Sequence, residues 1–204
     1  MKRLLTFLLL FLSVSMPAVC QKSGSPDTRK LGKALDYFTG GKYHEALLLF
    51  KELDTKYKLN PRFKAYIGIC YYNEWEYAAA CKYLDSALPS LEVYSPAERN
   101  VYYNAAAESH FLLEEYSKAV PLYEKQLLVC RDDEKGDIFY RLGFCHLFQN
   151  NFQDAADYFR SAVTFYERHD RTAHSSRAIQ AKKMLKGCEE KIKKSIDETP
   201  TDGE

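Results

Sequence analysis

Histidine and cysteine are the side chains here whose chemistry depends most on their neighbours, and the histidine spacing argues against catalysis. The five histidines are scattered, and His110 and His146 stand in a repeated pattern where other copies hold Tyr37 and Tyr71. We therefore expect both to pack within helices. The sequence has no glycine-rich phosphate loop, no Gly-x-Ser-x-Gly and no His-Glu-x-x-His. It predicts a protein that is not an enzyme and takes no cofactor.

The cysteines show no metal-binding pattern either. There is no Cys-x-x-Cys and no pairing of cysteine with histidine at zinc spacing, so the sequence predicts no metal site. Free cysteines are among the most buried residues, and we expect those after Cys20 to be small core residues. A disulfide between Cys70 and Cys81 stays open as an alternative, because the two lie on opposite sides of a predicted turn at Glu74-Trp75.

The first twenty residues have the pattern of a signal peptide. Lys2 and Arg3 precede an apolar run of about eleven residues, and Ala18-Val19-Cys20 follows as a small-x-small cleavage site. The run is too short to span a membrane, which takes roughly 20 residues. The sequence thus predicts an exported protein of the bacterial periplasm or cell envelope, with residues 1–20 as signal peptide and 21–27 as a flexible leader.

Cys20 supports a second interpretation of this N-terminus. A bacterial lipoprotein carries its lipid on a cysteine at the cleavage site, and such sites usually have Leu three residues earlier and Gly or Ala just before. Here those places hold Pro17 and Val19. Lipidation at Cys20, which would make the chain an outer-membrane lipoprotein, remains the alternative, and we expect membrane contact only in that case.

The charge of the chain is balanced, with 29 basic and 28 acidic residues. No long basic stripe is present, whereas proteins that bind nucleic acid neutralise phosphates with clustered Lys and Arg. We therefore expect no nucleic-acid partner.

A short sequence motif that recurs along the chain predicts the elements that position all of these residues. An aromatic residue is followed three residues later by alanine, and a large apolar residue comes four residues after that. The alanines are 34, 39 and 36 residues apart, at Ala46, Ala80, Ala119 and Ala155. A period in the thirties is typical of a solenoid built from helix pairs.

The repeats resemble the tetratricopeptide repeat family in detail. One copy has Ile67-Gly68 followed by Tyr71, Ala80, Leu84 and Ala87, and another has Leu142-Gly143 followed by Phe152, Ala155, Phe159 and Ala162. The resemblance implies an all-α, right-handed α-solenoid of about four helix pairs. Within the pairs we expect small residues to meet, so that Gly68, Ala107 and Gly143 face Ala80, Ala119 and Ala155.

This register divides the chain into units. A later helix with one apolar seam, including Ala181 and Cys188, is expected to cap the stack. The predicted repeats are residues 28–60, 61–94, 95–131 and 132–168, followed by the capping helix at 175–196 and a disordered tail at 197–204.

The family resemblance also implies a binding groove lined by the first helix of each pair. This set is rich in aromatic rings, which bury area at low entropic cost. The Lys and Asn that bind a free carboxylate tail in some family members are replaced by Leu31 and Leu35, so a C-terminal tail is not the expected ligand. The predicted groove residues are Ile69, Tyr72, Asn73, Asn104, Glu108, Phe111, Tyr140, Arg141, Phe144 and Phe148.

The sequence thus predicts an exported, non-enzymatic adaptor that binds a protein or peptide segment in this groove. Two alternatives remain open. One is a lipid-anchored component of a bacterial envelope assembly complex. The other is a glycan-binding module, because 16 Tyr and 12 Phe could stack on sugar rings, although Trp75 is the sole tryptophan.

Overall fold

The structure is a computed structural model, and it describes residues 25–169 and 176–198. Every regular element in these ranges is helical, and they contain no strand. The predicted all-α solenoid fold is therefore confirmed. The α-helices are α1 (Pro26–Thr39), α2 (Tyr43–Tyr57), α3 (Pro61–Asn73), α4 (Tyr77–Ala87), α5 (Pro96–Leu112), α6 (Tyr116–Leu127), α7 (Lys135–Phe148), α8 (Phe152–His169) and α9 (Ser176–Asp197), with 3₁₀ turns η1 (Leu88–Ser90) and η2 (Asp132–Glu134).

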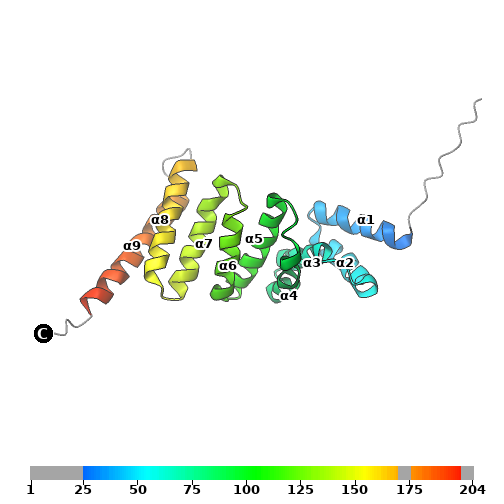
Figure 1. The fold of residues 1–204 in the computed structure, drawn as a ribbon, viewed down its shortest axis with the longest axis horizontal. Helices are drawn as coiled ribbons and strands as arrows, with labels where there is room; N and C mark the ends of the chain where they lie inside the picture. The colour runs from blue at the N-terminus through cyan, green and yellow to red at the C-terminus, as the bar shows by residue number, and fades with distance from the viewer. Residues whose placement is uncertain (1–24, 170–175, 199–204) are drawn as a thin grey trace, which may run out of the picture.

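The helices stack in chain order. Each packs mainly on the helices before and after it, and α3 also contacts α5. Figure 1 shows the result, an elongated row that runs from α1 and α2 at one end to α8 and α9 at the other. None of the described helices is both long and apolar enough to span a membrane.

Three first helices begin at the same signal, a polar cap followed by proline. Ser25, Asn60 and Ser95 each accept a hydrogen bond from a backbone N–H of the first turn. Proline at the next position costs nothing, because its missing N–H would have no partner within the helix. The cap at Ser25 starts α1 at Pro26, so the last residues of the predicted leader are helical.

The turns inside the pairs share one conformation. In each, one residue takes a left-handed backbone conformation five positions before the repeated alanine, which places all four pairs in one register. The φ values are 73° at Gly41, 60° at Trp75, 61° at Glu114 and 61° at Asn150.

The small residues allow close packing within the helix pairs. A Cβ atom on Gly143 would lie 2.6 Å from the ring of Phe159, and one on Gly68 would lie 2.6 Å from Cγ of Leu84. The large residue one turn beyond each repeated alanine therefore fills the space opposite the glycine. Gly68 also faces Ala80 as predicted, since its Cβ atom would lie 3.3 Å from the carbonyl oxygen of Ala80, whereas the three atoms nearest to a Cβ on Gly143 all belong to Phe159.

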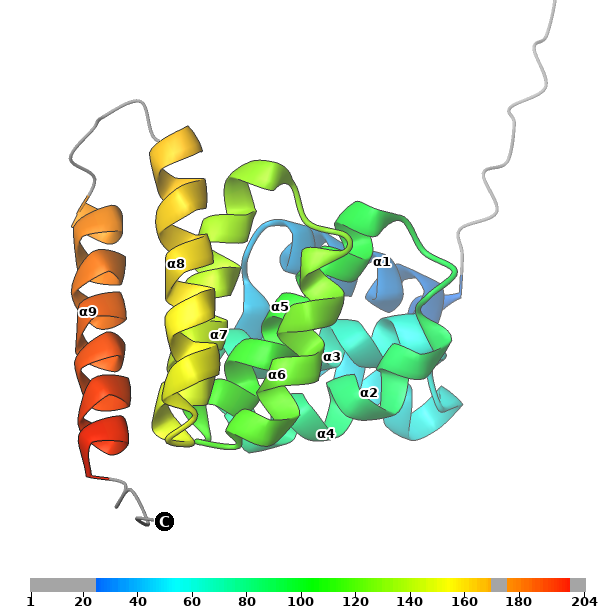
Figure 2. The same cartoon turned by 60° about the vertical axis from the view of Figure 1, so that its left-hand side comes forward.

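The last helix covers the end of the stack. Ala178, Ala181 and Cys188 of α9 are buried, and Figure 2 shows α9 lying alongside α8 over its length. The other faces of α9 are charged and exposed. The capping helix predicted at 175–196 is thus present, shifted by one residue at each end. The predicted signal peptide, Cys20 and residues 199–204 of the predicted tail lie outside the described residues.

Candidate binding groove

A cavity of about 660 Å³ lies on the first helices of the second, third and fourth pairs and extends to α9. We call it the central cavity. Its walls combine tyrosine rings with charged and amide side chains. The lining residues are Tyr72, Asn100, Val101, Asn104, Glu108, Tyr123, Gln126, Glu134, Asp137, Ile138, Tyr140, Arg141, Tyr166, Arg177 and Gln180.

An ion pair between α5 and α7 forms the middle of this lining. Arg141 donates through Nε to Oε1 of Glu108 and through Nη2 to Oε2, both at 2.8 Å. Such a two-point pair fixes both side chains in one geometry. Burial lowers the pKa of Arg141, but the charge and hydrogen bonds of Glu108 together with the nearby tyrosines outweigh burial and leave the pKa above its usual value. The guanidinium also lies 4.7 Å from the ring centre of Phe111.

Tyr123 of α6 reaches the same carboxylate from the second helix of the pair. Its hydroxyl donates to Oε1 of Glu108 at 2.7 Å. Burial, followed by the negative charge of Glu108, raises the pKa of Tyr123 well above its usual value, so the phenol stays protonated. Both oxygens of Glu108 are occupied by Tyr123 and Arg141. This carboxylate is therefore held in a fixed position as a hydrogen-bond acceptor.

Gln126 adds an unsatisfied acceptor to the cavity. Its Nε2 donates to Oδ1 of Asn100 at 3.1 Å and to Oδ1 of Asn104 at 3.3 Å. Its Oε1 is buried and accepts no hydrogen bond from the described residues. Buried polar atoms normally have a partner. A ligand or a water molecule that donates a hydrogen bond would satisfy this oxygen.

The end of the cavity near α9 carries a second charged group. Arg177 donates to both oxygens of Asp137, at 2.8 and 2.7 Å, and the hydroxyl of Tyr166 donates to Oδ1 at 2.7 Å. Asp137 lies at the start of α7, where a helix favours negative charge. These bonds join the capping helix to the fourth pair at the edge of the cavity.

The structure brings together part of the predicted groove. Tyr72, Asn104, Glu108, Tyr140 and Arg141 all line the central cavity. They come from three successive first helices, so the register taken from the family places them on one face.

The remaining predicted residues lie elsewhere. Ile69 is buried in the core, and the amide of Asn73 donates to the Ile69 carbonyl of its own helix at 2.8 Å. Phe144 packs edge-on against Phe159 at 5.3 Å between ring centres. Phe148 joins Phe111 in a ring cluster with Tyr116. These side chains serve packing, or line a separate aromatic edge beside the cavity.

Of the ten cavity residues that the sequence did not predict, five come from second helices and α9, four from the first helices α5 and α7, and one from η2. Tyr123 stands where the other copies have Phe50, Leu84 and Phe159, a position that packs inside each pair. The hydroxyl of Tyr123, in place of a wholly apolar side chain, is the sequence signal that could have identified this residue as part of the cavity. Arg177 could not have been placed, because its position depends on how α9 docks.

The structure also shows where His110 and His146 lie and whether the alternative disulfide forms. His146 stacks on Tyr158 with ring centres 5.1 Å apart, and His110 is 2 % exposed, so both pack within the stack as expected.

Cys70 and Cys81 are both free thiols. Cys70 packs against the first pair beside Phe50, whereas Cys81 lies beside His110 of the third pair. The two thiols point to opposite sides of their helix pair, so the disulfide is not formed.

Comparisons with known proteins identify the repeats. Residues 98–168 match the tetratricopeptide repeat family. MamA from Desulfovibrio magneticus RS-1 superposes with a TM-score of 0.56 at 15% identity, over 84% of this chain and 97% of MamA. MamA from AMB-1 superposes with a TM-score of 0.58 at 16% identity, over 82% of this chain and 92% of that one.

RapI in its apo form superposes with a TM-score of 0.61 at 15% identity, over 82% of this chain and 64% of RapI. At these identities the structures establish the fold alone. A comparison with curated proteins finds no match in sequence. The third and fourth helix pairs therefore match the tetratricopeptide repeat family in sequence, and the described remainder of the chain shares the helix-pair solenoid fold of these structures.

Proposed function

We propose that this protein is an exported adaptor that binds a segment of a partner protein in the central cavity. The observation that carries the proposal is the cavity itself, which presents tyrosine rings around a preorganised ion pair. Repeat solenoids offer extended surfaces of this kind for binding. The bonds from Arg141 and Tyr123 to Glu108 hold these charges in one geometry before any partner binds, which lowers the cost of ordering the site on recognition.

The chemistry of the lining favours a peptide. Tyrosine and arginine are the side chains most enriched where binding energy concentrates, and Tyr72, Tyr140 and Arg141 supply them. Gln126 offers a buried acceptor with no donor among the described residues, and a peptide backbone carries an N–H donor at nearly every residue. A partner segment crossing the cavity would then donate to Gln126 and pack on the tyrosines.

A substitution at the cavity rim tests this proposal without disturbing the core. Val101 lines the cavity and is 51 % exposed, whereas Val93 is 85 % exposed and lies outside the lining. Peptides selected from a displayed random library on the purified chain are titrated against both variants. We expect Val101→Asp to weaken binding at least about tenfold, the equivalent of about 1.4 kcal/mol, while Val93→Asp binds like the wild type.

Truncating a ring gives a second, larger change. Tyr72→Ala removes a lining ring that is only half buried. Loss of an aromatic anchor typically costs about 2 kcal/mol, or roughly thirtyfold in affinity. Selected peptides that bind both cavity variants as tightly as the wild type would exclude the cavity and move the site to another face.

Export rests on the sequence of residues 1–20, and the lipid-anchored alternative differs from it in one measurable quantity. Cleavage without lipid gives a mature chain with the mass of the polypeptide alone. Lipidation adds the mass of acyl chains at Cys20 and partitions the protein into the detergent phase. The mass of the mature N-terminal peptide distinguishes the two.

A further inference from the structure

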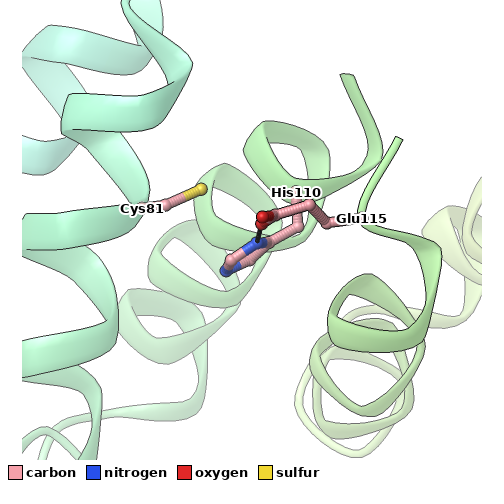
Figure 3. A group of neighbouring side chains, drawn as sticks. All are labelled: Cys81, His110 and Glu115. Atoms are coloured by element: carbon pink, nitrogen blue, oxygen red, sulfur yellow. Dashed lines mark hydrogen bonds and ion pairs between the residues drawn. The ribbon is translucent and has the colours of Figure 1, made fainter. Parts of the chain in front are cut away.

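Three side chains with metal-binding atoms meet between the second and third helix pairs, apart from the central cavity. Cys81 comes from α4, His110 from α5, and Glu115 from the turn that caps α6. One ligand atom of each lies within 4.8 Å of the other two. Figure 3 shows the three side chains grouped together, with the carboxylate of Glu115 joined to the imidazole ring of His110.

The surroundings of His110 resemble those of a histidine that binds a metal. Its Nδ1 lies 2.6 Å from Oε2 of Glu115, and its Nε2 lies 3.1 Å from Oδ1 of Asp85. A ligand histidine uses one nitrogen for the metal and donates the other N–H to a carboxylate, which fixes the ring. Here Nδ1 faces Glu115, and Nε2 can donate its hydrogen bond to Asp85.

Glu115 is likewise oriented by a neighbour. Its second oxygen, Oε1, accepts a hydrogen bond from Lys118 at 3.0 Å. This bond leaves Oε2 directed at His110. Glu115 is partly exposed, so an ion can reach the group from solvent, whereas His110 and Cys81 are buried.

From this geometry we propose that Cys81, His110 and Glu115 form a binding site for a divalent transition metal of the zinc class, with Asp85 orienting His110. Thiolate, imidazole and carboxylate are the ligands that Zn²⁺ takes in proteins. One thiolate and one carboxylate with a neutral imidazole balance the charge of the ion. The fourth position is open to water on the side of Glu115.

The distances suit an ion after a small adjustment. Zinc bonds of about 2.0 to 2.3 Å place tetrahedral ligand atoms roughly 3.3 to 3.8 Å apart. All three ligand atoms lie within 4.8 Å of one another, and rotation of the partly exposed Glu115 side chain would lengthen the 2.6 Å between its Oε2 and Nδ1 of His110 to that spacing. Binding releases the protons of the thiol and of the imidazole nitrogen that coordinates the ion.

A bound ion would join α4, α5 and the start of α6. It would connect two helix pairs that otherwise pack through side-chain contacts. The sequence predicted no metal site because the donors follow no local motif. Cys81 and His110 are 29 residues apart, and the stacking of the repeats is what brings them together.

Cobalt(II) titrated into the purified full chain, prepared without a histidine tag, tests the proposal. Thiolate ligation gives a charge-transfer band in the near ultraviolet, and tetrahedral geometry gives visible bands. We expect one equivalent to bind, with both features, and zinc(II) to displace the cobalt. Cys81→Ala should lose the charge-transfer band, and Glu115→Gln should weaken binding.

Two further variants supply the control and the positioning test. Cys70→Ala removes a buried thiol from the same helix pair, on its other side, and should leave the spectrum unchanged. Asp85→Asn should weaken cobalt binding about 10- to 100-fold, as the loss of an orienting carboxylate does, while the charge-transfer band persists at saturation. Circular dichroism confirms that each variant is folded.

Three results would overturn the proposal. One is a wild-type chain that gives no charge-transfer band at any cobalt concentration, in which case His110 is only paired with its two carboxylates. Another is a band that survives in folded Cys81→Ala. The third is a folded Glu115→Gln that binds as tightly as the wild type. Because none of the three ligands lines the central cavity, peptide binding can fail or succeed independently of these results.

Discussion

Gly143 shows how a single missing side chain determines the packing of a whole helix pair. Phe159 occupies the space where a Cβ atom would be. Gly187 of α9 is the matched case, because a Cβ atom there would meet nothing within 4 Å. Alanine at either position gains the same helix propensity, so a comparison of the two isolates the steric term.

We therefore expect Gly143→Ala to be less stable than Gly187→Ala by about 1 to 3 kcal/mol, the usual cost of overpacking a core. Gly187→Ala should itself stabilise the protein slightly, since glycine inside a helix costs about 0.5 to 1 kcal/mol relative to alanine. Urea denaturation of both variants measures the difference. Equal midpoints would mean that Phe159 moves aside freely.

The cysteines give a second prediction at the residue scale. Burial raises the pKa of Cys70 and of Cys145 to about 12, whereas Cys130 is only partly buried. Thiolate is the reactive form, so at pH 8 the two buried thiols should resist iodoacetamide and Cys130 should react first. Mass spectrometry of the alkylated peptides follows each site. Labelling of Cys70 as fast as Cys130 in the folded chain would contradict the buried placement.

For single residues, the sequence predicted which side chains share the face of the cavity better than it predicted which atoms they contact. The register identified Tyr72, Glu108 and Arg141 as neighbours on one face, because repeats place equivalent positions side by side. It could not predict that Arg141 pairs with Glu108 or that Phe144 turns to the core. Those outcomes depend on side-chain directions between pairs, which the period of the repeat does not specify.

Among the elements, α9 packs on the end of the stack through one apolar seam. Ala181 is fully buried against the fourth pair, and Lys183 is exposed. The apolar seam alone predicted both the existence of this helix and its approximate ends. The contribution of α9 to the cavity through Arg177 was not predictable. The apolar seam indicates which face of the helix is buried, but it does not indicate which residues of the fourth pair lie beside the helix ends.

We expect Ala181→Glu to destabilise the protein by about 2 kcal/mol or more, since a carboxylate would be buried without a partner. Lys183→Glu makes a surface change on the same helix and should alter stability by less than about 0.5 kcal/mol. Thermal unfolding by circular dichroism compares them. If both variants melt together with the wild type, α9 does not cap the stack.

The whole molecule is a row in which each helix depends mainly on its chain neighbours. In such a solenoid, stability is close to a sum of repeat and interface terms. Helices in the middle have neighbours on two sides, and those at the ends have fewer. Local opening should therefore differ along the chain.

Hydrogen exchange measures this gradient. We expect the amides of α5 to α7 to exchange most slowly and those of α1 to exchange fastest among the α-helices of the first three pairs. Equal protection of α1 and α5 would show that the chain unfolds as one cooperative unit.

The shared register explains why the architecture was predictable from sequence, since four copies of one pattern repeat the same local information.

The left-handed turn between α3 and α4 has a spectroscopic consequence. It holds Trp75, which is 79 % exposed and is the sole tryptophan of the chain. Its fluorescence in the folded protein should already be that of a hydrated indole, so the emission maximum will barely shift when the chain unfolds. A blue shift in native protein would instead signal that a binding partner has covered this edge of the second pair.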